Sequence, residues 1–321
     1  MKRVFTTIGV AGLLMSFSLF LNSIPDLTGF AIFQAMTIKQ SSIAMVVCFL
    51  IGVLFLVLGA SPEEKVKAQV TKLEEKLGHN VEVHTTLVRH GEKDKEGKLT
   101  GVGFGQAADY GKGMDASDAI KGYGSTTQRA FDTAEEIIKN APHGKKLSTK
   151  KKQEISMPPM SKEFFAAYVE HAKDGADNAN DWYMNLKKPF DKETGTSKRV
   201  AEGLAYMVLR NNAMAGKLHD GSKVDLINGT HQTMPEALLK EVMIRNVNGK
   251  RVVGFKNLKE IGGSLGYVEP VDFVTTTDAN GEKELKVNFR GEQYEVDMNK
   301  LNKLANSYRK KVKGRKHKSK F

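Results

Sequence analysis

The strongest constraint on the fold is a short β-branched apolar run that ends in a polar corner. Thr85-Thr86-Leu87-Val88 has the composition of a buried strand, and Arg89-His90-Gly91-Glu92 follows at once. Ligands usually bind where the strands of an α/β sheet end. Arg89 offers a donor fork suited to phosphate, Gly91 is expected to allow a sharp turn, and His90 has an ordinary pKa near 6.5. We therefore expect chemistry at His90.

Strand and helix patterns alternate along the middle of the chain, which indicates an α/β fold. The predicted strands cover residues 119–125 and 222–231, and the predicted helices cover residues 99–108, 126–138, 200–214 and 234–243. We expect a three-layer α/β/α arrangement with a mainly parallel central sheet. After residue 245, Asn248-Gly249 and Asn280-Gly281 predict β-hairpins that extend the edge of this sheet.

The second long strand also ends in a histidine, His231, and the start of the helix after the 119–125 strand carries Arg129. If the two strands are neighbours, two imidazoles and two guanidinium groups converge, and helix N-termini add positive potential. Such a group of side chains predicts an anion site.

The ordered motifs resemble the histidine phosphatase superfamily, which is also called the phosphoglycerate mutase-like family. Four motifs, spread over residues 81 to 245, carry the resemblance: Leu87-Val88-Arg89-His90-Gly91-Glu92; Leu99-Thr100 to Gly103 with Gln106-Ala107; Ser125-Thr126-Thr127-Gln128-Arg129-Ala130 with Thr133-Ala134; and Gly229-Thr230-His231. An isolated Arg-His-Gly would be weak evidence, whereas the ordered set is specific.

The resemblance implies a metal-independent phosphatase that needs no cofactor. His90 would be the nucleophile that becomes a phosphohistidine, and Arg89, Arg129 and His231 would hold the phosphate oxygens. The implied substrates are phosphomonoesters or phosphohistidine. A mutase of the same family and a catalytically weak phospholigand-binding module are the alternatives, and a metal-dependent enzyme is disfavoured because no His/Asp cluster has ligand spacing.

The proton donor for the leaving group departs from the family pattern. One branch of the family has an acid directly after the second histidine, and here that position is Gln232. The other branch takes a Glu from the segment after the second helix, where Glu163 is the first candidate and Glu154 the second. Residues 161–215 predict a helical insertion that roofs the pocket, with Tyr168, Trp182 and Tyr183 setting specificity.

Residues 1–60 predict a membrane anchor of two transmembrane helices. Val4 to Ile24 and Ile43 to Gly59 are apolar enough to be spanning candidates, although a cleaved signal peptide is an alternative for the first. The distribution of Lys and Arg places both termini in the cytoplasm, which predicts a cytoplasmic catalytic domain. The single cysteine, Cys48, excludes a disulfide framework within one chain.

The remaining organisation follows from charge and periodicity. Residues 61–80 predict an amphipathic linker helix that packs on the catalytic domain at residues 81–307, with homodimerisation as the alternative. Eight of the last thirteen residues are Lys or Arg, and without them the net charge of +12 falls to about +4. This basic tail, residues 308–321, is either solvated and disordered or binds anionic membrane lipid; nucleic acid is not favoured.

Overall fold

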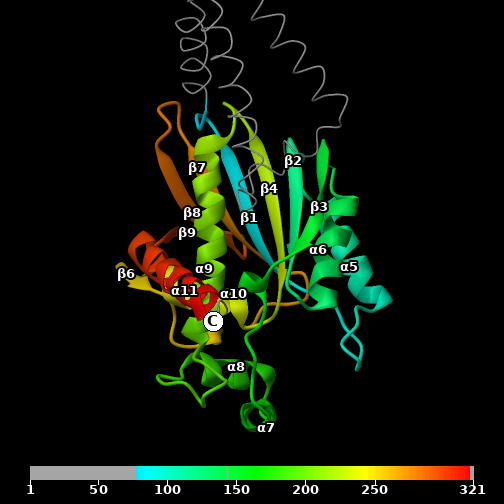
Figure 1. Ribbon diagram of the computed structural model, residues 1–321, viewed down its shortest axis with the longest axis vertical. Coiled ribbons are helices and arrows are strands. Elements are labelled where there is room, and N and C mark those ends of the chain that lie inside the picture. The colour runs from blue at the N-terminus through cyan, green and yellow to red at the C-terminus, as the bar shows by residue number, and fades with distance from the viewer. Residues whose placement is uncertain (1–76, 143, 319–321) are drawn as a thin grey trace, which may run out of the picture. The chain divides into compact units, whose positions relative to one another are not determined.

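The computed structural model describes residues 77–142 and 144–318, which build a nine-stranded sheet with helices packed around it (Figure 1). The strand order is β3-β2-β4-β1-β7-β8-β9-β5-β6. The strands are β1 (Glu82–Arg89), β2 (Ala119–Gly124), β3 (Lys145–Lys151), β4 (Lys223–Thr230), β5 (Met243–Val247), β6 (Lys250–Val253), β7 (Pro270–Thr277), β8 (Lys283–Phe289) and β9 (Glu292–Val296).

The sheet is mixed, so the expectation of a mainly parallel sheet is wrong. Only β3, β2, β4 and β1 run parallel to one another, and all pairings from β1 through β7 to β6 are antiparallel. The reason lies in the connections. Helical crossovers join the parallel strands, whereas short turns such as Asn248-Gly249 reverse the chain between neighbouring antiparallel strands. Five of the eight strand pairings in the described sheet are therefore antiparallel, and the two predicted hairpins are the β5–β6 and β7–β8 pairs among them.

Helices α5 (Gly101–Lys112) and α6 (Gln128–Asn140) pack on one face of the parallel strands. Ile120 and Ile227 of the sheet meet Ile137 and Ile138 of α6 in a buried apolar cluster. Helices α9 (Ser197–Met214), α10 (Met234–Val242) and α11 (Met298–Lys318) pack against one another, and α9 crosses in front of the sheet in Figure 1.

Two further helices, α7 (Lys162–Ala172) and α8 (Ala176–Met184), lie beyond the end of the sheet where β1 and β4 finish (Figure 1). Short 3-10 turns complete the described chain: η2 (Gln153–Ile155), η3 (Ala215–Lys217) and η4 (Leu258–Ile261). The strand and helix segments predicted between residues 85 and 243 are thus all present, with ends shifted by a few residues.

The described residues divide into two compact units. The first contributes only residues 77–79 and Gly216–Asp220, where the Gly78 N–H donates to the Leu218 carbonyl at 2.7 Å. The second unit contains the sheet and the site considered below.

The predicted membrane anchor and most of the predicted linker helix lie outside the described residues. Within residues 77–142 and 144–318, no helix has the length and apolar character needed to span a bilayer. The basic tail begins inside α11, which continues as far as Lys318.

Candidate functional site

The register of β1 against β4 brings the two predicted histidines together. Arg89 pairs with Thr230 at the ends of these parallel strands, and the His90 N–H donates to the Thr230 carbonyl at 3.0 Å. Residues 90 and 231 then leave the sheet side by side. The two imidazole rings meet edge to face with their centroids 5.4 Å apart, and both side chains are buried.

Gly91 is required by a close approach and not by the turn that the sequence suggested. Its φ is not positive, but a Cβ at this position would stand 2.5 Å from the carbonyl oxygen of Gly103 in α5. The helix side of this contact is equally tight: a Cβ on Gly103 would stand 2.3 Å from the carbonyl oxygen of Glu92, the residue after Gly91. Paired glycines therefore let α5 lie directly against the corner that carries His90. Thr100 caps this helix by accepting from the Gly103 N–H at 3.0 Å.

The hydrogen bonding of His90 exposes one nitrogen as a nucleophile. Its Nδ1 lies 2.8 Å from the Gly91 carbonyl oxygen, which can only accept, so Nδ1 carries the proton. In the neutral ring Nε2 then has a free lone pair. Burial is the largest cause that lowers the pKa of His90 to about 4; the cations Arg129, Arg89 and Lys93 contribute to this lowering, and the bond to Gly91 opposes it. The ring is therefore neutral at pH 7.

His231 is held by a short relay from the loop between β2 and α6. The Thr127 N–H donates to Ser125 Oγ at 3.1 Å, and Ser125 Oγ lies 2.9 Å from His231 Nε2. A serine oxygen has one proton and two lone pairs, so Ser125 can accept from Thr127 and also donate to an unprotonated Nε2, in which case Nδ1 of His231 carries the ring proton. Burial, together with smaller effects of Arg129 and His90, lowers the pKa of His231 to about 3.

The charge of Arg129 acts on both imidazoles, and that of Arg89 acts on His90. Arg89 donates through one terminal nitrogen to the Leu265 carbonyl at 2.6 Å, and Arg129 donates to the Gly97 carbonyl at 3.5 Å. The Nε atoms of both arginines are buried and have no acceptor within the described residues. Unused donors on two guanidinium groups are suited to an incoming oxyanion.

Sequence reasoning missed the loop of residues 262–269, which joins η4 to β7 and forms another wall of the site. Tyr267 from this loop lies under the Arg89 guanidinium at 4.1 Å from the ring centroid, and its ring centre is 6.2 Å from that of His90. No local pattern marks Tyr267, because its partners are more than 170 residues earlier in the chain.

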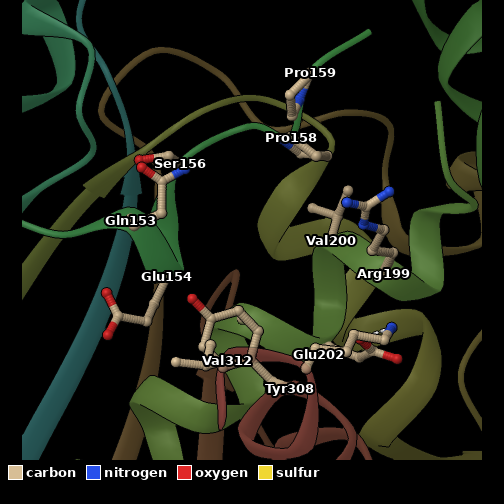
Figure 2. Close-up of a pocket in the computed structure, with 12 residues that line it drawn as sticks. Gln153, Glu154, Ser156, Pro158, Pro159, Arg199, Val200, Glu202, Tyr308 and Val312 are labelled. Carbon is tan, nitrogen blue, oxygen red and sulfur yellow. Dashed lines mark hydrogen bonds and ion pairs between the residues drawn. The ribbon is translucent and has the colours of Figure 1, made fainter. Parts of the chain in front are cut away.

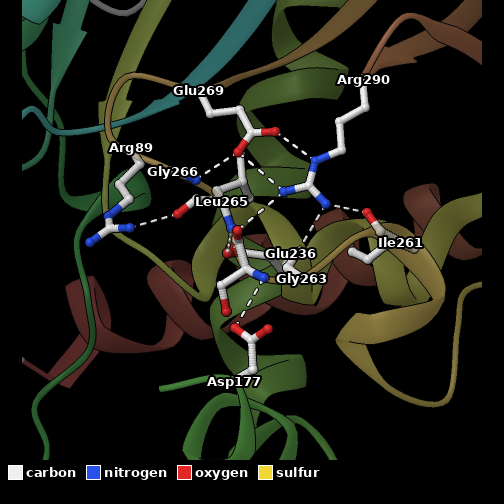
Figure 3. Close-up of polar contacts among 10 residues, drawn as sticks. Arg89, Asp177, Glu236, Ile261, Gly263, Leu265, Gly266, Glu269 and Arg290 are labelled. Carbon is white, nitrogen blue, oxygen red and sulfur yellow. Dashed lines mark hydrogen bonds and ion pairs between the residues drawn. The ribbon is translucent and has the colours of Figure 1, made fainter. Parts of the chain in front are cut away.

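The 262–269 loop is fixed by charged groups on both sides (Figure 3). Arg290 bonds Glu269 at 2.6 Å, and the Glu236 carboxylate accepts from the Leu265 N–H at 3.0 Å while the Leu265 carbonyl accepts from Arg89. Burial raises the pKa of Glu236 to about 7. The buried Glu236 carboxylate is thus connected to Arg89 through the backbone of Leu265.

The insertion is connected to the same loop through Asn180 of α8. Asn180 accepts from the hydroxyls of Tyr168 and Thr233 at 2.5 and 2.6 Å, and donates to Ser264 Oγ at 2.9 Å. Tyr168 is close enough to Arg89 for each to shift the other's pKa. Trp182 and Tyr183 instead pack within the insertion around Phe164.

Neither candidate proton donor contacts the imidazoles in the described part of the chain. Glu163 is exposed in the first turn of α7. Glu154 lines a separate small cavity of about 80 Å³ with Arg199, Glu202 and Tyr308 (Figure 2), and neither histidine of the pair lines that cavity. Their assignment as acids stays a prediction.

The arrangement can bind a small oxyanion beside an unprotonated imidazole nitrogen. Two neutral histidines and two arginines give a positively charged site, and His90 Nε2 has an unprotonated lone pair. Among residues 77–142 and 144–318, no group of three or more His, Cys, Asp or Glu side chains could hold a metal ion.

No protein-family model and no curated protein matches this chain. Solved structures do resemble it: a mycobacterial glucosyl-3-phosphoglycerate phosphatase is 14% identical, covers 64% of this chain and 97% of its own, and has a TM-score of 0.43. A mycobacterial hydrolase matches at 15% identity over 70% and 97% of the two chains with a TM-score of 0.42. A phosphoserine phosphatase from Entamoeba histolytica matches at 15% identity over 68% and 95%, with a TM-score of 0.36. At this identity and TM-score we draw no conclusion about activity.

Proposed function

We propose that this chain hydrolyses phosphomonoesters through a phosphohistidine on His90. One observation carries the proposal: His90, held with Nδ1 protonated and Nε2 free, faces His231 at 5.4 Å between the ends of β1 and β4. A neutral imidazole with an unprotonated Nε2 is a competent nucleophile at pH 7. Arg89 and Arg129 add the charge that a phosphoryl group needs as it is transferred.

The reaction has two balanced steps. In the first, His90 Nε2 bonds to phosphorus while the bond from phosphorus to the ester oxygen breaks, and the leaving alkoxide or phenolate takes a proton from solvent water. In the second, water attacks phosphorus and gives its proton to solvent, and the P–N bond breaks to return neutral His90 and inorganic phosphate. His231 Nδ1–H and the arginine donors stabilise the charge on the phosphoryl oxygens in both steps.

A phospholigand-binding module is the second candidate function. It is favoured by one observation, namely that neither imidazole of the pair has a carboxylate among its hydrogen-bond partners in the described residues. Such a module would bind phosphate with the same arginines and histidines but turn over slowly.

The test compares the full chain with His90→Asn, using an aryl phosphate in the presence of a chelator. His171→Asn is the matched control, because His171 is exposed on α7 and stacks on Trp182 away from the histidine pair. We expect chelator-resistant hydrolysis that His90→Asn abolishes and His171→Asn retains. Brief mixing with labelled substrate should also trap a phosphoenzyme that is absent from His90→Asn.

Other outcomes identify other functions. Phosphate binding without turnover in the unaltered chain would support the binding module and refute the enzyme. Activity that appears only when a divalent metal is added would point to a metal-dependent hydrolase.

We also propose that residues 1–60 anchor the protein in a membrane. The support is the pair of apolar segments in the sequence. Alkaline extraction of a membrane fraction tests this: an anchored chain stays in the pellet, whereas a chain released to the supernatant contradicts the proposal.

A further inference from the structure

Tyr267 presents an aromatic surface directly beside the proposed nucleophile. One part of its ring packs on the Arg89 guanidinium at 4.1 Å, and its centre lies 6.2 Å from the His90 ring. Tyr267 nevertheless remains 38% exposed. A partly open ring at this position is available to a group attached to a phosphate held by Arg89.

The backbone residue directly after Tyr267 has a conformation that costs energy. The next residue, Val268, has a φ of 56°, which is a genuine outlier for a β-branched side chain. Val268 is buried in the apolar cluster under α6, and its N–H donates to the Arg89 carbonyl at 3.0 Å. Backbone strain of this kind costs on the order of 1–3 kcal/mol and concentrates at functional sites. The hydrogen bond to Arg89 and the burial of the Val268 side chain offset this cost and hold the loop beside the corner that carries His90.

The surroundings of the two imidazoles favour a leaving group that departs without a strong acid. The main charged groups that act on His90 and His231 are the cations Arg129, Arg89 and Lys93. A phenol has a pKa of about 10, well below that of water or an aliphatic alcohol, so a phenolate leaves without full protonation far more readily than an alkoxide.

From these two independent features, we propose that Tyr267 is a specificity-determining residue that stacks on a planar aromatic leaving group, so that aryl phosphates are the preferred substrate class. The inference rests on the proposed phosphatase function. The phosphoryl group lies against Arg89 and His90, and the aryl ring attached to it lies against the exposed part of the Tyr267 ring. Aromatic pairs prefer offset or edge-to-face contact at 4.5–7 Å between centroids, the range in which Tyr267 already meets His90.

The test measures binding, so that it does not depend on turnover. Phenylphosphonate and cyclohexylphosphonate have similar sizes, cannot be hydrolysed, and differ in having a flat aromatic or a puckered aliphatic ring. Calorimetric titration of the full chain should show tighter binding of phenylphosphonate. Tyr267→Leu should weaken phenylphosphonate roughly five- to tenfold and cyclohexylphosphonate by less than twofold, the size expected for one aromatic pair.

Two further variants make each result decisive. Tyr267→Phe keeps the ring without the hydroxyl and should preserve the aryl preference. Tyr294→Leu changes a tyrosine on β9 that bonds Glu292, away from the histidine pair, and should bind both phosphonates as the unaltered chain does.

Several outcomes would overturn the inference. Equal weakening of both phosphonates in Tyr267→Leu would mean that the ring only positions Arg89. Unchanged binding of both phosphonates in Tyr267→Leu would refute the stacking role. The same loss of phenylphosphonate binding in Tyr267→Phe as in Tyr267→Leu would also refute it. A failure of the proposed function is seen separately, as absence of His90-dependent hydrolysis while the difference between the two phosphonates persists.

Discussion

Replacement of Ser125 by alanine is expected to uncouple His231 from the helix that follows β2. The Ser125 side chain is fully buried and connects the Thr127 N–H, at 3.1 Å, to His231 Nε2, at 2.9 Å. Alanine removes both bonds and adds none. Each such bond has a net value of about 1 kcal/mol, so we expect a loss of about 2 kcal/mol in the free energy of unfolding.

The same substitution should also change the proton position on His231. Without the serine hydroxyl, nothing within the described residues reserves Nε2 as an acceptor, and Nδ1 is no longer the favoured donor toward a bound oxyanion. Loss of one orienting bond of about 1 kcal/mol corresponds to a fall in kcat of roughly fivefold.

Three measurements check this reasoning. Urea unfolding gives the stability change, and it should appear as a lower midpoint with an unchanged slope. Multiple-bond ¹⁵N spectra of the histidines report the tautomer of His231, and aryl phosphate hydrolysis gives kcat. Ser148→Ala, an exposed serine on β3, is the control and should shift stability by less than about 0.5 kcal/mol. A Ser125→Ala chain with unaltered stability and the same His231 tautomer would refute the relay.

Two more predictions concern the nucleophile and the corner that carries it. His90 must be neutral to attack, and burial lowers its pKa to about 4. We therefore expect kcat/KM to stay level from pH 7 to about 5 and to fall only near pH 4. A fall centred at the ordinary histidine pKa of 6.5 would contradict this protonation state. Gly103→Ala places a Cβ 2.3 Å from the Glu92 carbonyl oxygen and should lower the free energy of unfolding by about 1–3 kcal/mol, whereas Gly105→Ala, in open space on the same helix, should raise it by up to about 1 kcal/mol. Equal effects of the two substitutions in urea unfolding would show that the contact between α5 and the corner is not tight.

The shifted pKa values of the histidines determine how the stability of the fold changes with pH. The pKa values of His90 and His231 are lower in the folded chain than the ordinary 6.5. The unfolded chain therefore binds more protons below that value, and the folded state loses stability as the pH falls from about 6.5 toward 4 and 3. His84 has the opposite effect on the pH dependence of stability. Its bonds to Asp272 and Glu82 raise its pKa to about 9, although burial acts to lower it. Its contribution is complete below pH 6.5 and is lost as the pH rises through 9.

The sequence predicted those parts of the fold that depend on local patterns. Alternation of β-branched runs with helical periods located β1, β2 and β4 and the helices after them, and the polar residue that follows each run marked a strand end. The hairpin turn at Asn248-Gly249 was equally local. The prediction that most strands pair in parallel was wrong. The direction of pairing depends on which strand lies next to β1, and that neighbour, β7, is more than 180 residues away in the chain.

By itself, the sequence determined that Arg89-His90 and His231 stand at strand ends, and that Arg129 begins a helix. Residue type and short-range spacing are sufficient for that, because strand and helix propensities act over only a few residues. Only the tertiary structure decided that β1 and β4 are neighbours, that Ser125 bonds Nε2 of His231, and that the 262–269 loop brings Tyr267 under Arg89. These contacts join segments far apart in the chain, so they depend on packing that no local pattern records.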